Sequence, residues 1–383
     1  MNKITGLKYR PQGLFFLACF ILFVFCTMAK TPDSSVAQIS STKDSVEVII
    51  AQEVAKLMKQ PGYTAVSGVI YLKGKAHHFH FGQLQNGKKP DNHTIYEIGS
   101  ITKTYTGLLL AQAVSDHKIG LDDDVRTYLD GQYPNLVLSG GRPITFRHLI
   151  THTSGLPLHN NCYDGMATVA EQLDCFKNLT ESDFFAALKN VKLVDNSGRN
   201  YHYSGVGTQL IGYILEHVYR LSYQDLFQKY IFSRSGEKET FSELTYNKDA
   251  NISIGKDSIG RPMPLINGYY KYSAGMKSST SAMLAYMKMY LESNDKVVRQ
   301  AMNRLAGTAQ YGRAYAWNTY NYDKEMKMLY HNGGSFGHSS WIALYPNQKV
   351  GIFIVTNVVM ADSQVKLNEL SNSIIDRIGI EGR

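Results

Sequence analysis

Residues 96–103 read Tyr96-Glu97-Ile98-Gly99-Ser100-Ile101-Thr102-Lys103, and they place a hydroxyl and an amine three positions apart. If Ser100 opens a helix, Lys103 lies on the same face, within reach of the serine hydroxyl. Burial lowers the pKa of a lysine, so a desolvated Lys103 can be neutral and accept the serine proton. The start of the helix would also supply N–H donors for a developing oxyanion. A helix N-cap followed by a solvated lysine gives the same pattern, so the surrounding sequence has to decide.

Helices and strands on both sides of this stretch predict a sheet built from both ends of the chain. Residues 45–58, 278–291 and 365–378 have helical periodicity, and a helix follows Ser100. Two strand-like runs before Ser100 are joined by Lys73-Gly74-Lys75, as in a hairpin. The predicted strands are residues 66–72, 76–81, 311–317, 326–330, 339–344 and 350–356.

Consecutive hairpin-like strands favour an antiparallel sheet over the alternating pattern of a doubly wound fold. We therefore expect an α/β (α+β) fold in which helices flank an antiparallel sheet formed from both chain ends. The sheet lobe takes residues 45–120 and 255–378, and a mostly helical second lobe takes residues 121–254. A catalytic cleft is expected between the two lobes.

Composition excludes several classes of protein. The 383 residues are 44% hydrophobic and 19% charged, which is neither a disordered nor a fibrous composition. The 40 basic and 32 acidic side chains give a net charge of +8. This excess is spread thinly, without a basic run, so the sequence indicates no nucleic-acid partner.

The N-terminus has the features of an export signal. A basic leader precedes the twelve apolar residues 14–25, which as a helix span ~18 Å, less than the ~30 Å core of a membrane. Thr27-Met28-Ala29 supplies small residues for a signal peptidase. We expect a signal peptide over residues 1–29, a flexible linker over 30–44 and an exported, periplasmic or secreted protein without a stable membrane span. A retained anchor is the alternative.

Cys162 and Cys175 are the two cysteines that remain beyond the leader, which contains Cys19 and Cys26. In an oxidising compartment they favour a disulfide, which would stabilise the fold by roughly 3 kcal/mol. Two free thiols or half of a metal site are the alternatives, and zinc is disfavoured because no second cysteine pair lies nearby.

Several further motifs follow residues 96–110 in order along the chain. They are Lys118-Ile119-Gly120-Leu121-Asp122-Asp123, Arg147-His148-Leu149-Ile150-Thr151-His152-Thr153-Ser154-Gly155-Leu156, Tyr203-Ser204-Gly205 and His331-Asn332-Gly333-Gly334. With these motifs, residues 66–357 resemble the serine hydrolase family of class C β-lactamases, DD-peptidases and related family VIII-type esterases. The resemblance implies a β-lactamase/transpeptidase-like fold, similar to that of penicillin-binding proteins.

The resemblance also implies catalytic roles for three residues. Ser100 corresponds to the acylated nucleophile, and Lys103 to its proton acceptor or to the group that keeps Tyr203 ionisable. Tyr203 would pass a proton to the leaving group and then activate the deacylating water; Tyr201 is its nearest rival. A phenol with its ordinary pKa of ~10 is a poor base, so we expect the charge of Lys103 to lower the pKa of Tyr203.

The substrate site implied by the resemblance contains two departures from the family pattern. The backbone N–H groups of Ser100 and Gly334 would form the oxyanion hole, and His331 and Gly333 would contact the substrate. Gly205 stands where the pattern often has asparagine, and His331 replaces a lysine whose charge attracts a substrate carboxylate. A histidine is mostly neutral at pH 7. Both departures suit a neutral ester, an amide or a small peptide at least as well as a carboxylated β-lactam.

A second serine offers an alternative nucleophile. Gly333-Gly334-Ser335-Phe336-Gly337 matches the nucleophile elbow of α/β-hydrolases, which would make Ser335 the nucleophile of an esterase. That elbow requires a strand before the serine and a helix after it, whereas residues 339–344 indicate a strand.

The histidines and the aromatic residues of the C-terminal part have simpler interpretations. His152 resembles a triad histidine, and we favour a loop residue bonded to backbone at a helix end. Strand alternation puts only His78 and His80, and not His77, on one face, so we expect a surface strand and no zinc site. Most of the aromatic residues between 311 and 322 are expected in the core, with one ring as a candidate wall of an acyl pocket.

The function predicted from these observations is an exported serine hydrolase that cleaves an amide, ester or β-lactam bond through an acyl-enzyme, without metal or cofactor. Its class would be β-lactamase, D-alanyl-D-alanine carboxypeptidase or esterase, and its partner a small molecule or a peptidoglycan-like peptide. A penicillin-binding sensor that is acylated without turnover is the alternative from another class, beside the esterase that uses Ser335.

Overall fold

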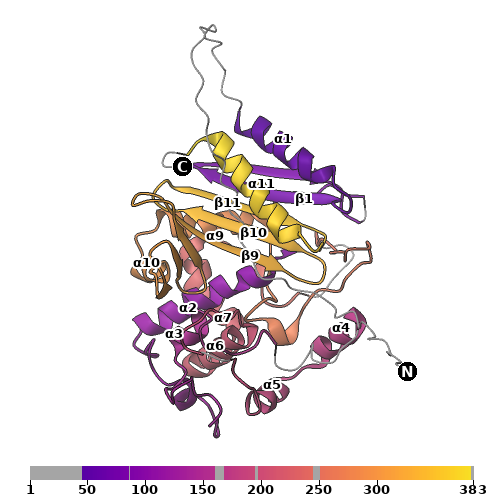
Figure 1. Ribbon diagram of the computed structural model, residues 1–383. Helices are drawn as coiled ribbons and strands as arrows, with labels where there is room; N and C mark the ends of the chain where they lie inside the picture. The colour runs from indigo at the N-terminus through magenta and orange to yellow at the C-terminus, as the bar shows by residue number, and fades with distance from the viewer. Residues whose placement is uncertain (1–44, 86, 160–167, 195–196, 245–250, 381–383) are drawn as a thin grey trace, which may run out of the picture. The chain divides into compact units, whose positions relative to one another are not determined.

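The computed structural model describes residues 45–380, except for residues 86, 160–167, 195–196 and 245–250 (Figure 1). The predicted signal peptide and linker therefore lie outside the described residues. Within the described ranges, none of the helices is both long enough and apolar enough to cross a membrane.

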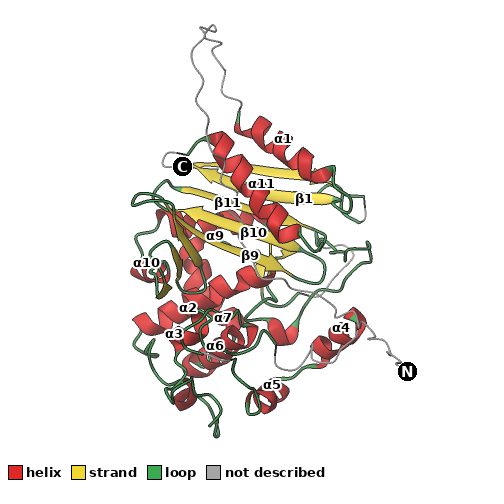
Figure 2. Cartoon of the chain, in the orientation of Figure 1, coloured by secondary structure: helices red, strands yellow, loops and turns green. Residues whose placement is uncertain are grey.

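An antiparallel sheet of eight strands forms the centre of the described chain (Figure 2). The spatial order is β2-β1-β11-β10-β9-β8-β7-β6, so the N-terminal hairpin pairs with the last strand. This arrangement confirms the predicted sheet built from both chain ends. The strands are β1 Ala65–Leu72, β2 Lys75–Gly82, β6 Ala306–Gly307, β7 Tyr311–Arg313, β8 Asn318–Asn321, β9 Lys327–Gly334, β10 Ser339–Tyr345 and β11 Val350–Thr356.

Helices cover both faces of this sheet. Helices α1 (Val46–Met58) and α11 (Ser363–Ile378) pack together on one face, and α9 (Thr280–Glu292) contacts β1 and β11 on the other (Figure 1). Successive side chains of a strand point to opposite faces. In β11, Ile354 accordingly joins the hydrophobic core beneath α1 and α11, whereas Phe353 joins the core on the α9 side.

Helix α2 (Thr102–Ser115) lies in the hydrophobic core on the α9 side of the sheet. All its residues from Thr102 to Ala113 are buried. It packs against α6 (Gly205–Tyr219) and α10 (Lys296–Ala301), so residues 102–113 have no solvated face. The remaining helices are α3 Phe146–Ile150, α4 Val169–Asn178, α5 Glu181–Leu188, α6 Gly205–Tyr219, α7 Tyr223–Phe227, α8 Ser233–Ser235 and α10 Lys296–Ala301.

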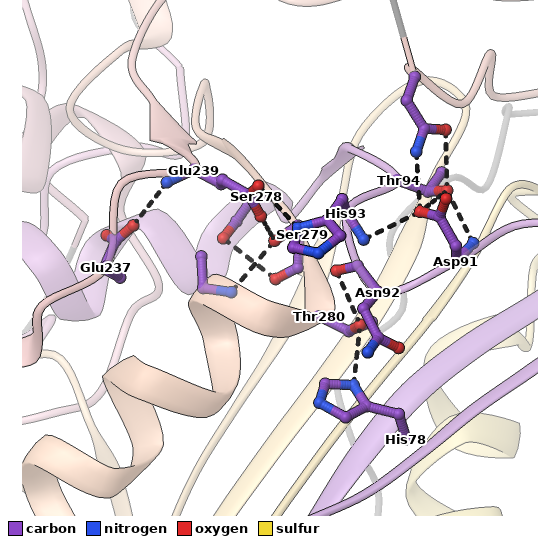
Figure 3. Close-up of polar contacts among 12 residues, drawn as sticks. His78, Asp91, Asn92, His93, Thr94, Glu237, Glu239, Ser278, Ser279 and Thr280 are labelled. Atoms are coloured by element: carbon purple, nitrogen blue, oxygen red, sulfur yellow. Dashed lines mark hydrogen bonds and ion pairs between the residues drawn. The ribbon is translucent and has the colours of Figure 1, made fainter.

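A second, three-stranded sheet has the order β3-β5-β4 and was not predicted from the sequence. Its strands are only two residues long, which is too short to produce a periodic pattern: β3 Tyr96–Glu97, β4 Thr240–Phe241 and β5 Lys277–Ser278. Polar contacts fix its edge to the start of α9, where Glu239 accepts a hydrogen bond from the Ser279 hydroxyl (2.5 Å) and pairs with His93 (2.8 Å) (Figure 3). This sheet holds the chain that leads into Ser100.

The predicted strand over residues 311–317 is wrong in its second half. Strand β7 ends at Arg313, and Ala316 adopts a left-handed conformation with φ +64°. The chain turns there before β8 begins at Asn318. Tyr315 and Trp317 are buried in the core, as expected, whereas Tyr311 is 37% exposed.

Candidate active site

Ser100 lies in a 3₁₀ turn, Gly99–Ile101, between β3 and α2. Main-chain contacts hold the residue that precedes this turn: Ile98 N–H donates to Met276 O (3.0 Å), and Ile98 O accepts a hydrogen bond from the Ser340 hydroxyl (2.9 Å). The small sheet and β10 therefore fix the position of Ser100 from two sides.

The end of β9 packs directly against this turn. Gly99 has φ +52°, and a Cβ atom added there would lie 2.5 Å from the backbone nitrogen of Gly334. Gly333 similarly faces Ile98 O, with no space for a side chain. Only glycine permits this approach of two main chains. The backbones of Ser100 and Gly334 are thereby brought together, as an oxyanion hole requires.

Lys103 directs its amine at Ser100. Its Nζ lies 3.2 Å from Ser100 Oγ and 2.9 Å from the carbonyl oxygen of Ser273. The side chain is only 2% exposed. This burial lowers the pKa of Lys103 to about 7, because the charged form loses its hydration. At neutral pH a substantial share of Lys103 is therefore a neutral amine.

Tyr203 lies next to Lys103, two residues before the start of α6. Its ring centroid is 4.8 Å from Lys103 Nζ, and its hydroxyl interacts with the side chain of Ser100. Burial raises the pKa of Tyr203 well above its usual range, and the hydrogen bond with Ser100 only partly opposes this. The expected lowering of the Tyr203 pKa is therefore wrong, and Lys103 is the group of this pair that titrates near neutral pH.

Tyr201, the rival of Tyr203, is 48% exposed, and its ring stacks against the guanidinium of Arg313, 4.2 Å from its centroid. Of the two tyrosines, Tyr203 is the one that the structure places beside Ser100.

His331 is buried next to this group, with 2% of its surface exposed and its ring centroid 6.5 Å from that of Tyr203. Burial, together with the charge of Lys103, lowers the pKa of His331 to about 3. The site therefore has a neutral imidazole at the position where the family pattern has a lysine.

The absence of a side chain at Gly205 has a steric reason. A Cβ atom there would lie 2.5 Å from the carbonyl oxygen of Leu158, which accepts a hydrogen bond from Gly205 N–H (3.2 Å). The loop after α3 thus occupies the space that an asparagine side chain would need.

Four aromatic rings beside the site were missed by the sequence analysis. Phe176 of α4 lies 4.6 Å from Tyr270, 5.5 Å from Phe336 and 5.8 Å from His159, measured between ring centroids. Phe336 comes two residues after Gly334, and the charge of Lys103 contributes to lowering the pKa of His159, after burial. These rings come from separate loops and helices without a common periodicity, so no sequence signal indicates that they meet.

Ser335 serves the turn between β9 and β10. Its hydroxyl accepts hydrogen bonds from Gly337 N–H (3.2 Å) and His338 N–H (2.9 Å), and it also bonds to the buried carboxylate of Glu97. The segment that follows is strand β10 and not a helix. The nucleophile-elbow alternative is therefore wrong.

Glu97 links the turn before Ser100 to this same β9–β10 turn. Its carboxylate contacts His338 Nδ1 (3.3 Å) and accepts a hydrogen bond from Ile266 N–H (2.5 Å). Burial alone would raise the pKa of Glu97, but the hydrogen bonds, with that to His338 the strongest, keep it below its usual value. Both segments that supply the candidate oxyanion donors share this anchor.

The other predicted sites give a mixed picture. His78 and His80 lie on one face of β2 with ring centroids 6.3 Å apart, whereas His77 contacts Glu47. Across the described ranges, no group of three or more histidine, cysteine, aspartate or glutamate side chains is arranged to hold a metal ion. Cys162 lies outside the described residues, so its disulfide with Cys175 stays a prediction.

Comparison with known proteins agrees with this geometry. The Beta-lactamase family model matches residues 50–370. Among curated proteins, Protein flp of Staphylococcus aureus (strain N315) is 27% identical over 279 residues, which are 69% of this chain and 53% of that protein. The chain therefore spans about half the length of this relative. The Beta-lactamase of Psychrobacter immobilis is 24% identical over 363 residues, covering 85% of this chain and 86% of the relative.

Two solved structures have the same fold. The class C beta lactamase from Rhodobacter sphaeroides matches with a TM-score of 0.71 and 20% identity, over 86% of this chain and 99% of that one. The Beta-Lactamase/D-Alanine Carboxypeptidase from Pseudomonas syringae matches with a TM-score of 0.71 and 17% identity, over 86% and 98%.

Proposed function

This chain belongs to the beta-lactamase family of serine hydrolases, and we propose that it is an exported enzyme that cleaves an uncharged ester or amide through an acyl-enzyme on Ser100. The observation that carries the proposal is the contact of 3.2 Å between Lys103 Nζ and Ser100 Oγ. Because burial lowers the pKa of this lysine to about 7, it can take the serine proton at neutral pH.

In the proposed acylation step, Lys103 accepts the proton of Ser100 while Oγ attacks the substrate carbonyl carbon. The negative charge that develops on the carbonyl oxygen is stabilised by the N–H groups of Ser100 and Gly334. When the bond to the leaving group breaks, Tyr203 donates its proton to that group and regains one from the Lys103 ammonium. The raised pKa of Tyr203 suits this role, because a phenol that stays protonated is ready to donate.

Deacylation repeats these transfers with water as the nucleophile. Water attacks the acyl carbonyl carbon and passes its proton through Tyr203 to Lys103. Collapse of the second tetrahedral intermediate returns a proton to Ser100 Oγ and releases the carboxylic acid. The enzyme is thereby restored with Ser100 as an alcohol and Lys103 as an amine.

Two features support an uncharged substrate. The imidazole of His331 has a pKa of about 3, so at neutral pH it provides no positive charge for a substrate carboxylate. An apolar wall next to the end of β9, the strand that carries Gly334, is offered by Phe176, Tyr270 and Phe336. Burial of an apolar acyl or leaving group against these rings would contribute roughly 25 cal/mol per Å² of apolar surface removed from water.

A labelling experiment tests the nucleophile. The wild-type protein is treated with a fluorophosphonate probe and with a fluorescent penicillin, and the labelled peptide is mapped by mass spectrometry. We expect the label on Ser100, its loss in Ser100→Ala and its retention in Ser335→Ala. A label that survives in Ser100→Ala would contradict the proposal.

A comparison of substrates tests the substrate class. We expect p-nitrophenyl butyrate to be turned over with a larger kcat/KM than a chromogenic cephalosporin. Intact-mass spectrometry after mixing with each compound distinguishes the sensor alternative, which predicts a long-lived adduct on Ser100 with both. Export is tested by N-terminal sequencing of protein recovered outside the cytoplasm, for which we expect a start at Lys30.

A further inference from the structure

His152 lies in the loop after α3, and it is the buried imidazole nearest to the Tyr203 ring. Only 3% of its surface is exposed, and the two ring centroids are 4.6 Å apart. The backbone of His152 has φ +59°, in the left-handed region that side-chain-bearing residues adopt rarely. Conformations of this kind persist where the surrounding structure imposes them, and they are frequent at functional sites.

His152 also binds the residues on both sides of Tyr203. Its carbonyl oxygen accepts a hydrogen bond from His202 N–H (2.7 Å), and its Nδ1 accepts one from Ser204 N–H (3.3 Å). One residue therefore holds the main chain before Tyr203, the main chain after it and the ring itself.

The tautomer of His152 follows from these contacts. An Nδ1 that accepts a hydrogen bond carries no proton, so a neutral ring is protonated at Nε2. Burial lowers the pKa of His152 well below its usual range, and the charges of Lys103 and His331 add to this effect. Within the described residues Nε2 has no hydrogen-bond partner. A buried donor without a protein partner is uncommon, so this N–H is available to a water molecule or to the substrate.

We propose that His152 is the positioning residue of Tyr203, holding its ring and both neighbouring peptide groups so that the phenol stays aligned with Ser100. The proposal rests on the function proposed above. His152 acts through Tyr203 and not as the base of Ser100, because its Nδ1 is occupied by a peptide N–H. A displacement of about 1 Å at a proton-transfer group can reduce turnover by about 100-fold, which explains why a single tyrosine is held at three points.

Two substitutions separate the contacts of His152. His152→Asn keeps a side-chain acceptor and tolerates the left-handed backbone, but it removes the ring. His152→Phe keeps a ring against Tyr203 and cannot accept the hydrogen bond from Ser204. We expect each variant to lower kcat for p-nitrophenyl butyrate roughly 10-fold to 100-fold while KM stays within about twofold. His78→Ala, which removes a half-buried imidazole on β2, is the matched control and should keep wild-type kcat.

A double-mutant cycle with Tyr203→Phe shows whether His152 acts through Tyr203. If it does, His152→Asn causes no further loss of kcat in the Tyr203→Phe background. Losses that multiply in the double variant, or wild-type kcat in both single variants, would overturn the proposal. Circular dichroism and thermal unfolding check that each variant is folded, and the His152→Phe cycle gives the same information if His152→Asn is not.

The two proposals fail in different ways. If the wild-type protein neither labels on Ser100 nor turns over an ester, the proposed function is wrong. If it does both and the His152 variants behave like His78→Ala, only the role of His152 is wrong.

Discussion

Lys103 shows how burial turns a common side chain into a reactive one. A lysine amine in water is almost fully protonated at neutral pH, and a protonated amine has no lone pair for the serine proton. Lys103 belongs to α2, and it is buried there together with its neighbours on the helix. This burial lowers the pKa of Lys103 to about 7. In the proposed mechanism, the reactivity of Ser100 is therefore set by a neighbour whose charge depends on pH in the physiological range.

We predict that the rate of acylation by a p-nitrophenyl ester rises with pH through about 7 and levels off above it. Below its pKa Lys103 is an ammonium ion and cannot accept a proton, so the rate falls towards low pH by about tenfold per unit. The burst rate, measured by stopped flow between pH 5 and pH 9, checks this expectation.

Lys277 provides a control for this assignment, because burial also lowers its pKa, to about 8. Its Nζ bonds to the carbonyl oxygen of Ile266 and to Asn267 (2.6 Å), away from Ser100. We expect Lys277→Met to keep the limb near pH 7 and Lys103→Arg to abolish the burst at every pH. If the rise of the rate near pH 7 disappears only in Lys277→Met, the group that titrates is Lys277 and our assignment to Lys103 is wrong.

At the scale of elements, the start of α6 and the loop after α3 fit so closely that the sequence at one depends on the backbone of the other. Ser204 caps α6 through its hydroxyl, which also donates to Pro157 O (2.8 Å), and Gly205 N–H donates to Leu158 O (3.2 Å). This contact places Tyr203 at the end of a loop that is anchored on its C-terminal side.

Substitution of Gly205 tests this fit. We predict that Gly205→Ala lowers the free energy of unfolding by about 1–3 kcal/mol, since its Cβ would meet Leu158 O. Gly205→Asn, which restores the family pattern, should not increase the turnover of a cephalosporin. Denaturant titration and steady-state assays measure these effects.

The matched control lies two residues further along the same helix. A Cβ atom at Gly207 would have its nearest neighbours at 3.4 Å, an ordinary contact distance. Gly207→Ala should change the free energy of unfolding by less than about 1 kcal/mol. Equal effects at both positions would show that the contact with Leu158 does not limit position 205.

At the scale of the whole molecule, one buried carboxyl makes the stability of the fold depend on pH. Glu237 is 4% exposed, its Oε2 accepts a hydrogen bond from Glu239 N–H (3.0 Å), and its Oε1 is without a partner within the described ranges (Figure 3). Burial raises its pKa from 4.5 to about 7. Between these values the folded state keeps a proton that the unfolded state has lost, so stability falls as pH rises.

We predict that Glu237→Gln removes this dependence. The variant should gain stability relative to the wild type between pH 5 and pH 8, by at most about 3 kcal/mol. Urea unfolding at the two pH values measures the difference, with Glu243→Gln, an exposed carboxylate on the same segment, as the control. An equal difference between Glu237→Gln and wild type at both pH values would contradict the prediction.

How much of this molecule can be predicted from its sequence depends on the range of each contact. Ser100 and Lys103 are three residues apart, so helical geometry alone predicts their contact, and strand alternation gives the two faces of the sheet. The approach of Gly334 to Gly99 and that of His152 to Tyr203 join loops and strands far apart in the sequence. No local periodicity encodes such contacts, and family resemblance indicated only the first of them.

The pairing of β1 with β11 joins two segments that lie far apart along the chain. Val66 of β1 pairs with Thr356 of β11, and β10 and β9 continue the sheet from β11 to Gly334. Such distant pairings make folding slow, because the loop that they close is long. We therefore expect the approach of Gly334 to Gly99, on which the proposed oxyanion hole depends, to form late in folding.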